Sequence, residues 1–375
     1  MMRKFQLHAV DWWIVGSVSF LILISIFTMS SFDEGSSRFI RQALWGIISL
    51  GVLFFTARLD TSFLKKSNVL FLLFGISNVL LLLVILLGKT TKGATSWFDL
   101  GGISFQPSDL VKIVLILILA KYLSRRHVEI ANLKHLVITG IYCLIPLFLV
   151  FLQPDFGSAV IFGVIWFGMV LISGLSKKHL LILIGGGLLV GGLLWGFAFK
   201  PYQKARIMNF LNPLADIRGT GYNAYQSMIA VGSGQLIGKG VGFGTQSRLN
   251  FLPEYETDFI FAASAEEWGF IGSMLILLCY GIIFWRITRL AIAGTTNFET
   301  LYAVGIGIYF FSHTIINIGM NIGLLPVTGL TLPFMSYGGS HLVAECFALG
   351  ILFSLFKHKR SIHQEDMGYE FLGKS

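Results

Sequence analysis

The segment Asn250-Phe-Leu-Pro-Glu-Tyr-Glu-Thr-Asp-Phe-Ile-Phe-Ala262 joins a polar, glycine-rich loop to a long apolar stretch. Asp258 stands at the boundary, where its carboxylate would be within reach of both water and lipid. The same segment holds Glu254 and Glu256, which we expect to support the loop. This pattern predicts a membrane helix from about residue 260 onward and a chemically active loop, 200–259, in front of it.

The composition excludes an ordinary soluble protein. Of the 375 residues, 55% are hydrophobic and only 13% are charged, and the mean hydropathy is +0.76. Soluble domains carry about 25% charged residues, so lipid is the expected surroundings of most of the surface. The net charge of +9 does not indicate nucleic acid, because the basic residues fall in short clusters between apolar runs.

Ten apolar runs are long enough to cross a hydrocarbon core, which takes about 20 residues. Only helices fit, because every backbone group in lipid must be satisfied within its own segment. The predicted fold class is therefore all-α, a polytopic membrane protein with ten transmembrane helices in one domain, 1–375. A large extracellular loop, 200–259, separates helices seven and eight, and a cytoplasmic tail covers 357–375. The runs are 12–30, 40–57, 69–88, 106–123, 135–152, 157–174, 179–199, 260–286, 300–322 and 340–356.

Lys and Arg residues alternate between the two sides of this topology. Most lie in every second connection, and such positively charged connections face the cytoplasm. Both termini are therefore expected inside, with the 200–259 loop outside. The basic connections are 58–66, 121–134, 177–178, 286–289 and 357–374, and the short opposite connections hold Arg38, Arg41, Lys89 and Lys92.

Two charged residues lie near the outer end of the run 106–123. Asp109 and Lys112 are three residues apart, so they share one helix face. Ionisable groups within a membrane usually face a cavity or a partner. Two interpretations stay open: an ion pair that only fixes helix packing, or a site in which Lys112 holds an anionic substrate group and Asp109 positions it.

Other outer residues also have two interpretations. Asp258 is either the N-cap of its helix, with Thr257 beside it, or a general base, and Asp155 is either an N-cap or a substrate contact. In the long loop, Arg206 precedes the glycine-rich segment 219–244. Glycines let backbone amides approach a phosphate closely, although a mobile loop without a ligand has the same composition.

Polar pairs and stripes occur on three later helices. They are Glu266 with Glu267, the stripe His313, Asn317 and Asn321, and the pair His341 and Glu345. Such stripes commonly hold membrane helices together, and we favour this over substrate contact. For Glu266 and Glu267 we expect structural carboxylates paired with a basic or hydroxyl group. No spacing of His, Cys or Asp signals a zinc site.

The outer motifs together resemble the shape, elongation, division and sporulation (SEDS) family of bacterial membrane proteins. They are spread in order over nearly the whole chain. Within the family, Gly244–Pro253 and Gln153 look more like the members that elongate rods than like those that act in division. The matching motifs are Phe105-Gln-Pro-Ser-Asp-Leu-Val-Lys112, Gln153-Pro-Asp155, Tyr225–Gly234, Phe251-Leu-Pro-Glu254, Thr257-Asp-Phe-Ile-Phe261 and Leu332-Pro-Phe-Met-Ser-Tyr-Gly-Gly339.

This resemblance implies a peptidoglycan glycosyltransferase that polymerises lipid II, usually in complex with a class B penicillin-binding protein. The essential aspartate of the family falls on Asp258, and its acidic residue and lysine fall on Asp109 and Lys112. The sequence departs from the family at Asp109, where glutamate is usual. Ser336, in the last motif, is a further expected substrate contact.

Lipid II carries a sugar on a lipid pyrophosphate, and its polymerisation inverts the donor sugar from an α to a β linkage. A single displacement does this with a base on the acceptor hydroxyl and cations on the leaving pyrophosphate. We expect Asp258 to be the base, and Lys112 with Arg206 or Arg41 to hold the pyrophosphate. A divalent cation such as Mg²⁺ is a conceivable helper there.

Two other functions remain open. A lipid II flippase is compatible with intramembrane charges, but we expect it to show polar residues at the midplane and the inner mouth as well. A non-catalytic scaffold of a cell-wall synthase is the third possibility. Polymer formation from supplied lipid II separates these two from the enzyme.

Overall fold

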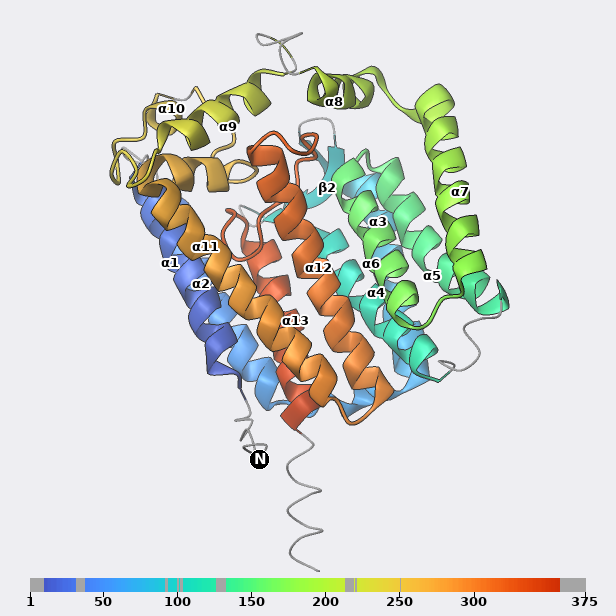
Figure 1. Ribbon diagram of the computed structural model, residues 1–375. Coiled ribbons are helices and arrows are strands. Elements are labelled where there is room, and N and C mark those ends of the chain that lie inside the picture. The colour runs from blue at the N-terminus through green and yellow to red at the C-terminus, as the bar shows by residue number, and fades with distance from the viewer. Residues whose placement is uncertain are drawn as a thin grey trace, which may run out of the picture.

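Each of the ten apolar runs lies on a helix of the computed structural model (Figure 1). Apart from Lys357, the predicted tail 357–375 lies outside the described residues. The structure describes residues 10–31, 38–91, 94–99, 101, 104–125, 133–212, 219, 221–249 and 251–357. The ten helices are α1 (Trp12–Ser30), α2 (Arg38–Arg58), α3 (Ser67–Leu87), α4 (Pro107–Ser124), α5 (Leu133–Leu152), α6 (Phe156–Ile172), α7 (Lys177–Leu193), α11 (Ile260–Ala293), α12 (Asn297–Asn321) and α13 (Gly339–Lys357).

Within the described residues, eight helices are long and apolar enough to cross a membrane. The exceptions among the ten are α6, which has 17 residues, and α4, which carries Asp109, Lys112 and Lys121. Asp109 and Lys112 are buried against other helices, so these two charges belong to the interior of the bundle and not to its lipid-facing surface. The chain is a multi-pass helical protein, and the count of ten spans stays a prediction.

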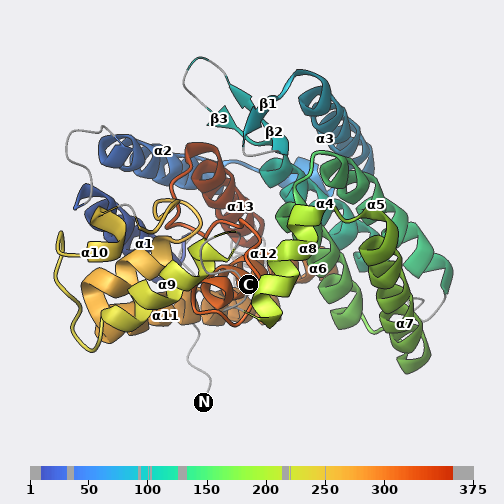
Figure 2. The same ribbon diagram turned by 90° about the horizontal axis from the view of Figure 1, so that it is seen from above.

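The all-α prediction is incomplete, because a small antiparallel sheet connects α3 to α4. Its strands follow the order β1 (Lys89–Thr91), β2 (Ala94–Asp99) and β3 (Ser104–Phe105). This stretch is rich in threonine and aromatic residues, which favour the pleated conformation. The sheet stands beside the C-terminal end of α3 (Figure 2).

The predicted loop 200–259 is largely helical in its described part. After the π-helical turn η2 (Leu194–Ala198), it contains α8 (Pro201–Leu211), α9 (Tyr222–Ser233) and α10 (Thr245–Arg248). These helices lie across the top of the bundle (Figure 1). At the opposite end, the 3₁₀ turn η1 (Ser62–Lys65) joins α2 to α3.

The helix α11 is broken at Gly269, where the sequence suggested a continuous helix ending near residue 286. Gly269 has φ 66° and ψ −162°, a conformation that suits glycine. The break frees backbone groups, and Phe270 donates a hydrogen bond to the carbonyl of Gln235 at 2.8 Å. Lys239 donates in return to the carbonyl of Glu266 at 3.0 Å. These bonds fasten the segment between α9 and α10 to the start of α11.

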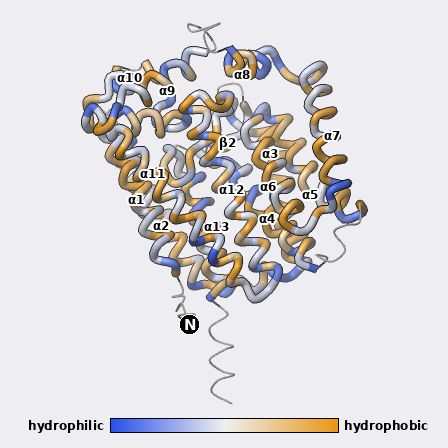
Figure 3. Tube along the Cα trace, viewed as in Figure 1, coloured by the Kyte–Doolittle hydropathy of each residue, from blue (hydrophilic) through white to orange (hydrophobic). Residues whose placement is uncertain are grey.

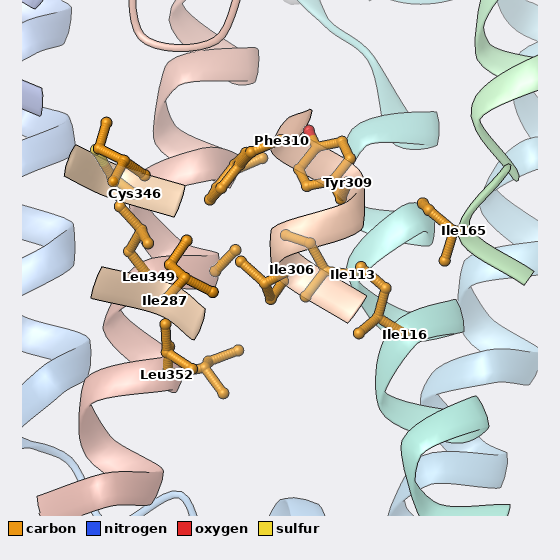
Figure 4. Packing of buried hydrophobic residues seen from close by; sticks show 14 of the residues in the cluster. Ile113, Ile116, Ile165, Ile287, Ile306, Tyr309, Phe310, Cys346, Leu349 and Leu352 are labelled. Carbon is orange, nitrogen blue, oxygen red and sulfur yellow. The ribbon is translucent and has the colours of Figure 1, made fainter. Parts of the chain in front are cut away.

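The centre of the bundle is α12, which packs against α4, α6, α11 and α13. Figure 2 shows it between the group α1, α2 and α11 and the group α3 to α7. The helices of the bundle consist mostly of hydrophobic residues (Figure 3), and many of their large apolar side chains are exposed, as expected where lipid is the solvent. The side chains packed between α12 and its neighbours include Ile306 and Phe310 of α12, Ile113 of α4, and Leu349 and Leu352 of α13 (Figure 4).

Candidate active site

A cavity of about 610 Å³ opens between the bundle and the outer elements. Its wall comes from the sheet, the starts of α4 and α6, α8, the turn before α11 and the segment 326–339 that precedes α13. Residues from distant parts of the chain therefore meet at one place. The charged residues that line it are Lys89, Asp99, Asp109, Lys112, Asp155, Arg206 and Asp258.

Asp258 lies half-buried in the turn before α11 and lines the cavity. Phe259 occupies the cap position of that helix, and no side-chain hydrogen bond caps it. The structure therefore does not use Asp258 as an N-cap. A Cβ atom on Gly329 would lie 3.6 Å from Oδ2 of Asp258, so this glycine places bare backbone beside the carboxylate.

Two asparagines of α12 fix the backbone of Asp258. Asn317 and Asn321 each donate a hydrogen bond from Nδ2 to its carbonyl oxygen at 3.0 Å. The Oδ1 atom of Asn321 accepts from the backbone N–H of Ala262 at 3.1 Å. Asn317 and Asn321 thus hold α12 to the segment that carries Asp258, as predicted for this polar stripe, whereas His313 of the same stripe lines the cavity.

Ser336 is held by hydrogen bonds to the backbone of two neighbouring segments. Its hydroxyl donates to the carbonyl of Thr257 at 2.6 Å and accepts from the N–H of Leu332 at 2.7 Å. Ser336 is buried and is not among the residues that line the cavity. The structure thus gives it a place behind Asp258, and the predicted contact with substrate has no support in this geometry.

Asp109 and Lys112 form a buried ion pair at the cavity wall. Lys112 Nζ lies 3.1 Å from Asp109 Oδ1, and the two side chains are 2% and 3% exposed. Lys112 Nζ also lies 3.5 Å from Nε2 of His313, whose Nδ1 lies 3.2 Å from the carbonyl oxygen of Thr331. An ammonium group has three N–H donors, so Lys112 can contact a ligand in the cavity while it keeps both protein partners.

Behind this ion pair lies a second pair, which the sequence showed only as an i, i+4 motif. His341 Nδ1 lies 3.2 Å from Asp109 Oδ2, and His341 Nε2 lies 2.8 Å from Glu345 Oε1. Both residues are buried. We expected them to hold helices together. The structure adds that His341 contacts Asp109, and only the approach of α13 to α4 could reveal this.

Of the remaining predicted substrate-binding residues, Asp155 and Arg206 line the cavity and Arg41 does not. Asp155 is the N-cap of α6, accepting from Ser158 N at 3.0 Å, and it also accepts from Gln106 Nε2 at 3.0 Å. It lines the cavity, as does Arg206 of α8. Arg41 is exposed on α2 and is not among the lining residues. Its contact with a pyrophosphate remains only a prediction from the sequence.

The carboxylates Glu266 and Glu267 have the structural role that we predicted. Glu266 lies 2.6 Å from Lys239 Nζ. Glu267 accepts hydrogen bonds from the hydroxyl of Ser31 at 2.5 Å and from the N–H of Gly242 at 2.7 Å. They hold the segment between α9 and α10 and are absent from the cavity lining.

An exposed ion pair marks the rim of the cavity. Lys89 Nζ lies 2.8 Å from Asp99 Oδ2, across the first two strands. The hydrogen bond to Asp99 and the charge of its carboxylate raise the pKa of Lys89 above its ordinary value. In the described part of the chain, no group of three or more His, Cys, Asp and Glu side chains could hold a metal ion.

The model of the cell cycle protein family of FtsW, RodA and SpoVE matches residues 3–361. The chain belongs to this family. The resemblance to SEDS proteins is thereby confirmed. Peptidoglycan glycosyltransferase MrdB of Escherichia coli K12 is 39% identical over 294 residues, which cover 77% of this chain and 78% of MrdB.

Solved structures of SEDS proteins have the same fold. A chain from a peptidoglycan synthase complex, described as coordinating polymerization and crosslinking, is similar with a TM-score of 0.81. The two chains are 31% identical, with 94% of this chain and 99% of that one covered. The rod shape determining protein RodA of Thermus thermophilus gives a TM-score of 0.70 at 29% identity, with 95% and 98% covered.

Proposed function

We propose that this protein is a peptidoglycan glycosyltransferase that polymerises lipid II into glycan strands for cell-wall elongation and rod shape. Its relative in Escherichia coli bears the name of that activity, and a similar solved structure is the rod shape determining protein RodA. The observation that carries the proposal is the cavity that brings Asp258 together with Lys112 and Arg206.

The charges around the cavity suit a lipid-linked sugar pyrophosphate. The donor has an anionic centre between a lipid tail and a sugar, so its site must adjoin both the apolar bundle and water. Lys112 is held at the inner wall by α4, and Arg206 comes from α8 above the bundle. Cations from both layers can therefore contact one pyrophosphate.

Asp258 is the proposed general base. It takes the proton of the acceptor hydroxyl while that oxygen attacks the anomeric carbon of the donor. The bond from this carbon to the pyrophosphate breaks, and the electron pair leaves with the pyrophosphate, whose growing charge Lys112 and Arg206 stabilise. One displacement of this kind inverts the α-linked donor to a β-linked product. The two amides that hold the Asp258 carbonyl keep the base in place.

We place the protein in the bacterial cytoplasmic membrane as one domain with ten spans. The basic connections predict both termini in the cytoplasm and the cavity on the outer face. The proposed partners are lipid II, the nascent glycan strand, membrane lipids and a class B penicillin-binding protein. The similarity to a chain of a peptidoglycan synthase complex supports such a transpeptidase partner.

The packing below the cavity favours a polymerase over a lipid II flippase. A flippase needs a polar route through the midplane. Beneath Tyr309, the space between α4, α12 and α13 is filled with buried apolar side chains such as Ile113, Ile306 and Leu349 (Figure 4). This apolar packing separates the polar residues of the cavity from the ion pairs Lys65–Glu299 and Arg286–Asp11 at the opposite end of the bundle.

The deciding experiment reconstitutes the full chain with its transpeptidase partner and supplies fluorescent lipid II. The wild-type protein should form glycan strands, and Asp258→Asn should lose about 10²–10⁴-fold in rate, the usual contribution of a positioned base. The matched control is Asp60→Asn, because Asp60 is exposed at the opposite end of the bundle. A folded Asp258→Asn protein with the wild-type rate would refute the base, and no polymer from wild-type protein would favour a flippase or a scaffold.

A divalent cation such as Mg²⁺ at the pyrophosphate is part of the proposal. Bound substrate would supply the phosphate oxygens that such an ion prefers, with a carboxylate of the cavity as a further ligand. Polymerisation should stop after treatment with a chelator and return when Mg²⁺ is added. Full activity in the chelator would leave charge stabilisation to Lys112 and Arg206 alone.

A further inference from the structure

The carboxylate of Asp109 is held between cations on two different helices. Its Oδ1 atom lies 3.1 Å from Nζ of Lys112 on α4, and its Oδ2 atom lies 3.2 Å from Nδ1 of His341 on α13. All three side chains are at most 4% exposed. Oδ1 accepts a hydrogen bond from Lys112 and Oδ2 has an ionic contact with His341, so both oxygens of this short side chain lie against a partner.

His341 is itself held from the other side. Its Nε2 atom lies 2.8 Å from Oε1 of Glu345, one turn further along α13. The other oxygen of Glu345 accepts a hydrogen bond from the N–H of Phe334 at 2.8 Å. The imidazole also contacts the Thr331 hydroxyl, with Oγ1 2.7 Å from Nε2. Glu345 thus ties His341 to the segment that forms the cavity wall.

The charges of this cluster balance when His341 is an imidazolium. Two buried carboxylates, Asp109 and Glu345, then face two cations, Lys112 and His341. Buried charges are costly unless they are paired, and among the described residues Oδ2 of Asp109 and Oε1 of Glu345 have only their ionic contacts with His341. A neutral residue at position 341 would leave one excess negative charge in the bundle, next to the site where a pyrophosphate is to bind.

We propose that His341, oriented by Glu345, is a positioning residue that holds Asp109 against Lys112 and so fixes the Lys112 ammonium at the cavity wall. The inference rests on the proposed function, because it gives Lys112 the pyrophosphate of the donor as its ligand.

A residue that only held helices together would not need contacts that lead to the cavity wall, as those of His341 do. Asn78, for example, donates only to the carbonyl of Phe74 within its own helix. The contacts of His341 lead instead to the cavity on two routes, through Asp109 to Lys112 and through Thr331. Asp109, Lys112 and Thr331 all line the cavity, whereas His341 does not. This is the arrangement of a residue that acts through others.

The test measures lipid II binding, polymerisation kinetics and melting temperature of the purified complex for His341→Gln. If His341 positions Lys112, the Kd and KM for lipid II should rise about tenfold, which corresponds to about 1.4 kcal/mol. The control is His135→Gln, which removes another buried histidine, one paired with Tyr122 away from the cavity. It should leave Kd and KM unchanged.

Charge balance predicts how a second substitution behaves. Glu345→Gln in the His341→Gln background restores neutrality, so the double variant should bind lipid II better than His341→Gln alone. It should also remain foldable if the single variant does not. Normal Kd and KM in folded His341→Gln protein, or a double variant weaker than either single one, would overturn the positioning role.

The two proposals fail in different ways. If wild-type protein makes no polymer, the proposed function fails, and lipid II binding still reports whether His341 matters. If wild-type protein polymerises and His341→Gln lowers only the melting temperature, His341 is structural and the glycosyltransferase function stands.

Discussion

Asn317 donates a hydrogen bond from Nδ2 to the carbonyl oxygen of Asp258 at 3.0 Å. The same amide also donates to the carbonyl of Leu330 at 2.7 Å. Asn317 thus joins the turn that carries Asp258 to the segment that carries Leu330, and both segments line the cavity. Asn321 adds a second hydrogen bond to the carbonyl of Asp258. The position of the proposed base therefore depends on a helix that starts 39 residues later in the chain.

The first prediction concerns the hydrogen bonds that Asn317 and Asn321 make to the carbonyl of Asp258. Asn321→Leu has a similar volume but leaves the Asp258 carbonyl and the Ala262 N–H with fewer partners, at about 1–3 kcal/mol for each buried group left unsatisfied. Polymerisation should fall at least tenfold and the melting temperature should drop. Asn78→Leu, whose amide bonds only within α3, should keep its activity. Equal polymerisation rates and melting temperatures of the two variants would argue against a role of Asn321 in holding Asp258.

The second prediction separates stability from catalysis at the buried ion pair. Lys112→Met leaves a buried carboxylate without one of its cations, and breaking such a pair costs about 3–5 kcal/mol. Thermal unfolding of the purified protein should show a clear loss. Adding Asp109→Asn should recover much of the melting temperature, because no excess charge remains, yet polymerisation should stay lost. Active double-variant protein would remove Lys112 from the proposed mechanism.

The third prediction tests the break in α11. Gly269→Ala places a Cβ atom 2.2 Å from the backbone nitrogen of Gly238, in a conformation with positive φ. The variant should fold poorly and detach the segment between α9 and α10, which limited proteolysis would detect. Gly281→Ala, in the same helix with no atom within 4 Å of the new Cβ, should behave as wild type. Similar proteolysis of both proteins would contradict the strained junction.

The fourth prediction compares two arginines that the sequence could not rank. Arg206 lines the cavity and Arg41 does not. A hydrogen bond to a charged group contributes about 1.5–3 kcal/mol, so Arg206→Ala should raise the KM for lipid II roughly ten- to a hundredfold by the same scale. Arg41→Ala should leave KM within twofold. A larger effect at Arg41 would show that the substrate binds elsewhere.

Much of the candidate site could be predicted from the sequence, because its charged residues stand near the ends of predicted membrane helices. The spacing of Asp109 and Lys112 predicted a shared face, and the ion pair is confirmed. Their burial and their contacts with His313 and His341 could not be predicted, because they depend on the packing of α4 against α12 and α13. Ser336 was predicted to contact the substrate, whereas in the structure hydrogen bonds to backbone atoms occupy its hydroxyl.

The long apolar helices follow from the amino-acid pattern alone, since an apolar run of about 20 residues has one stable form in lipid, the helix. The sequence by itself also determined the family, because motifs in a fixed order identify homologues without any coordinates. Tertiary structure decided which polar residues meet. Asp258, Lys112 and Arg206 share a cavity because α11 and α4 begin at the same face of the bundle and α8 lies across that face. Their meeting depends on contacts between segments that are distant in the chain, and the spacing of residues within one segment cannot predict such contacts.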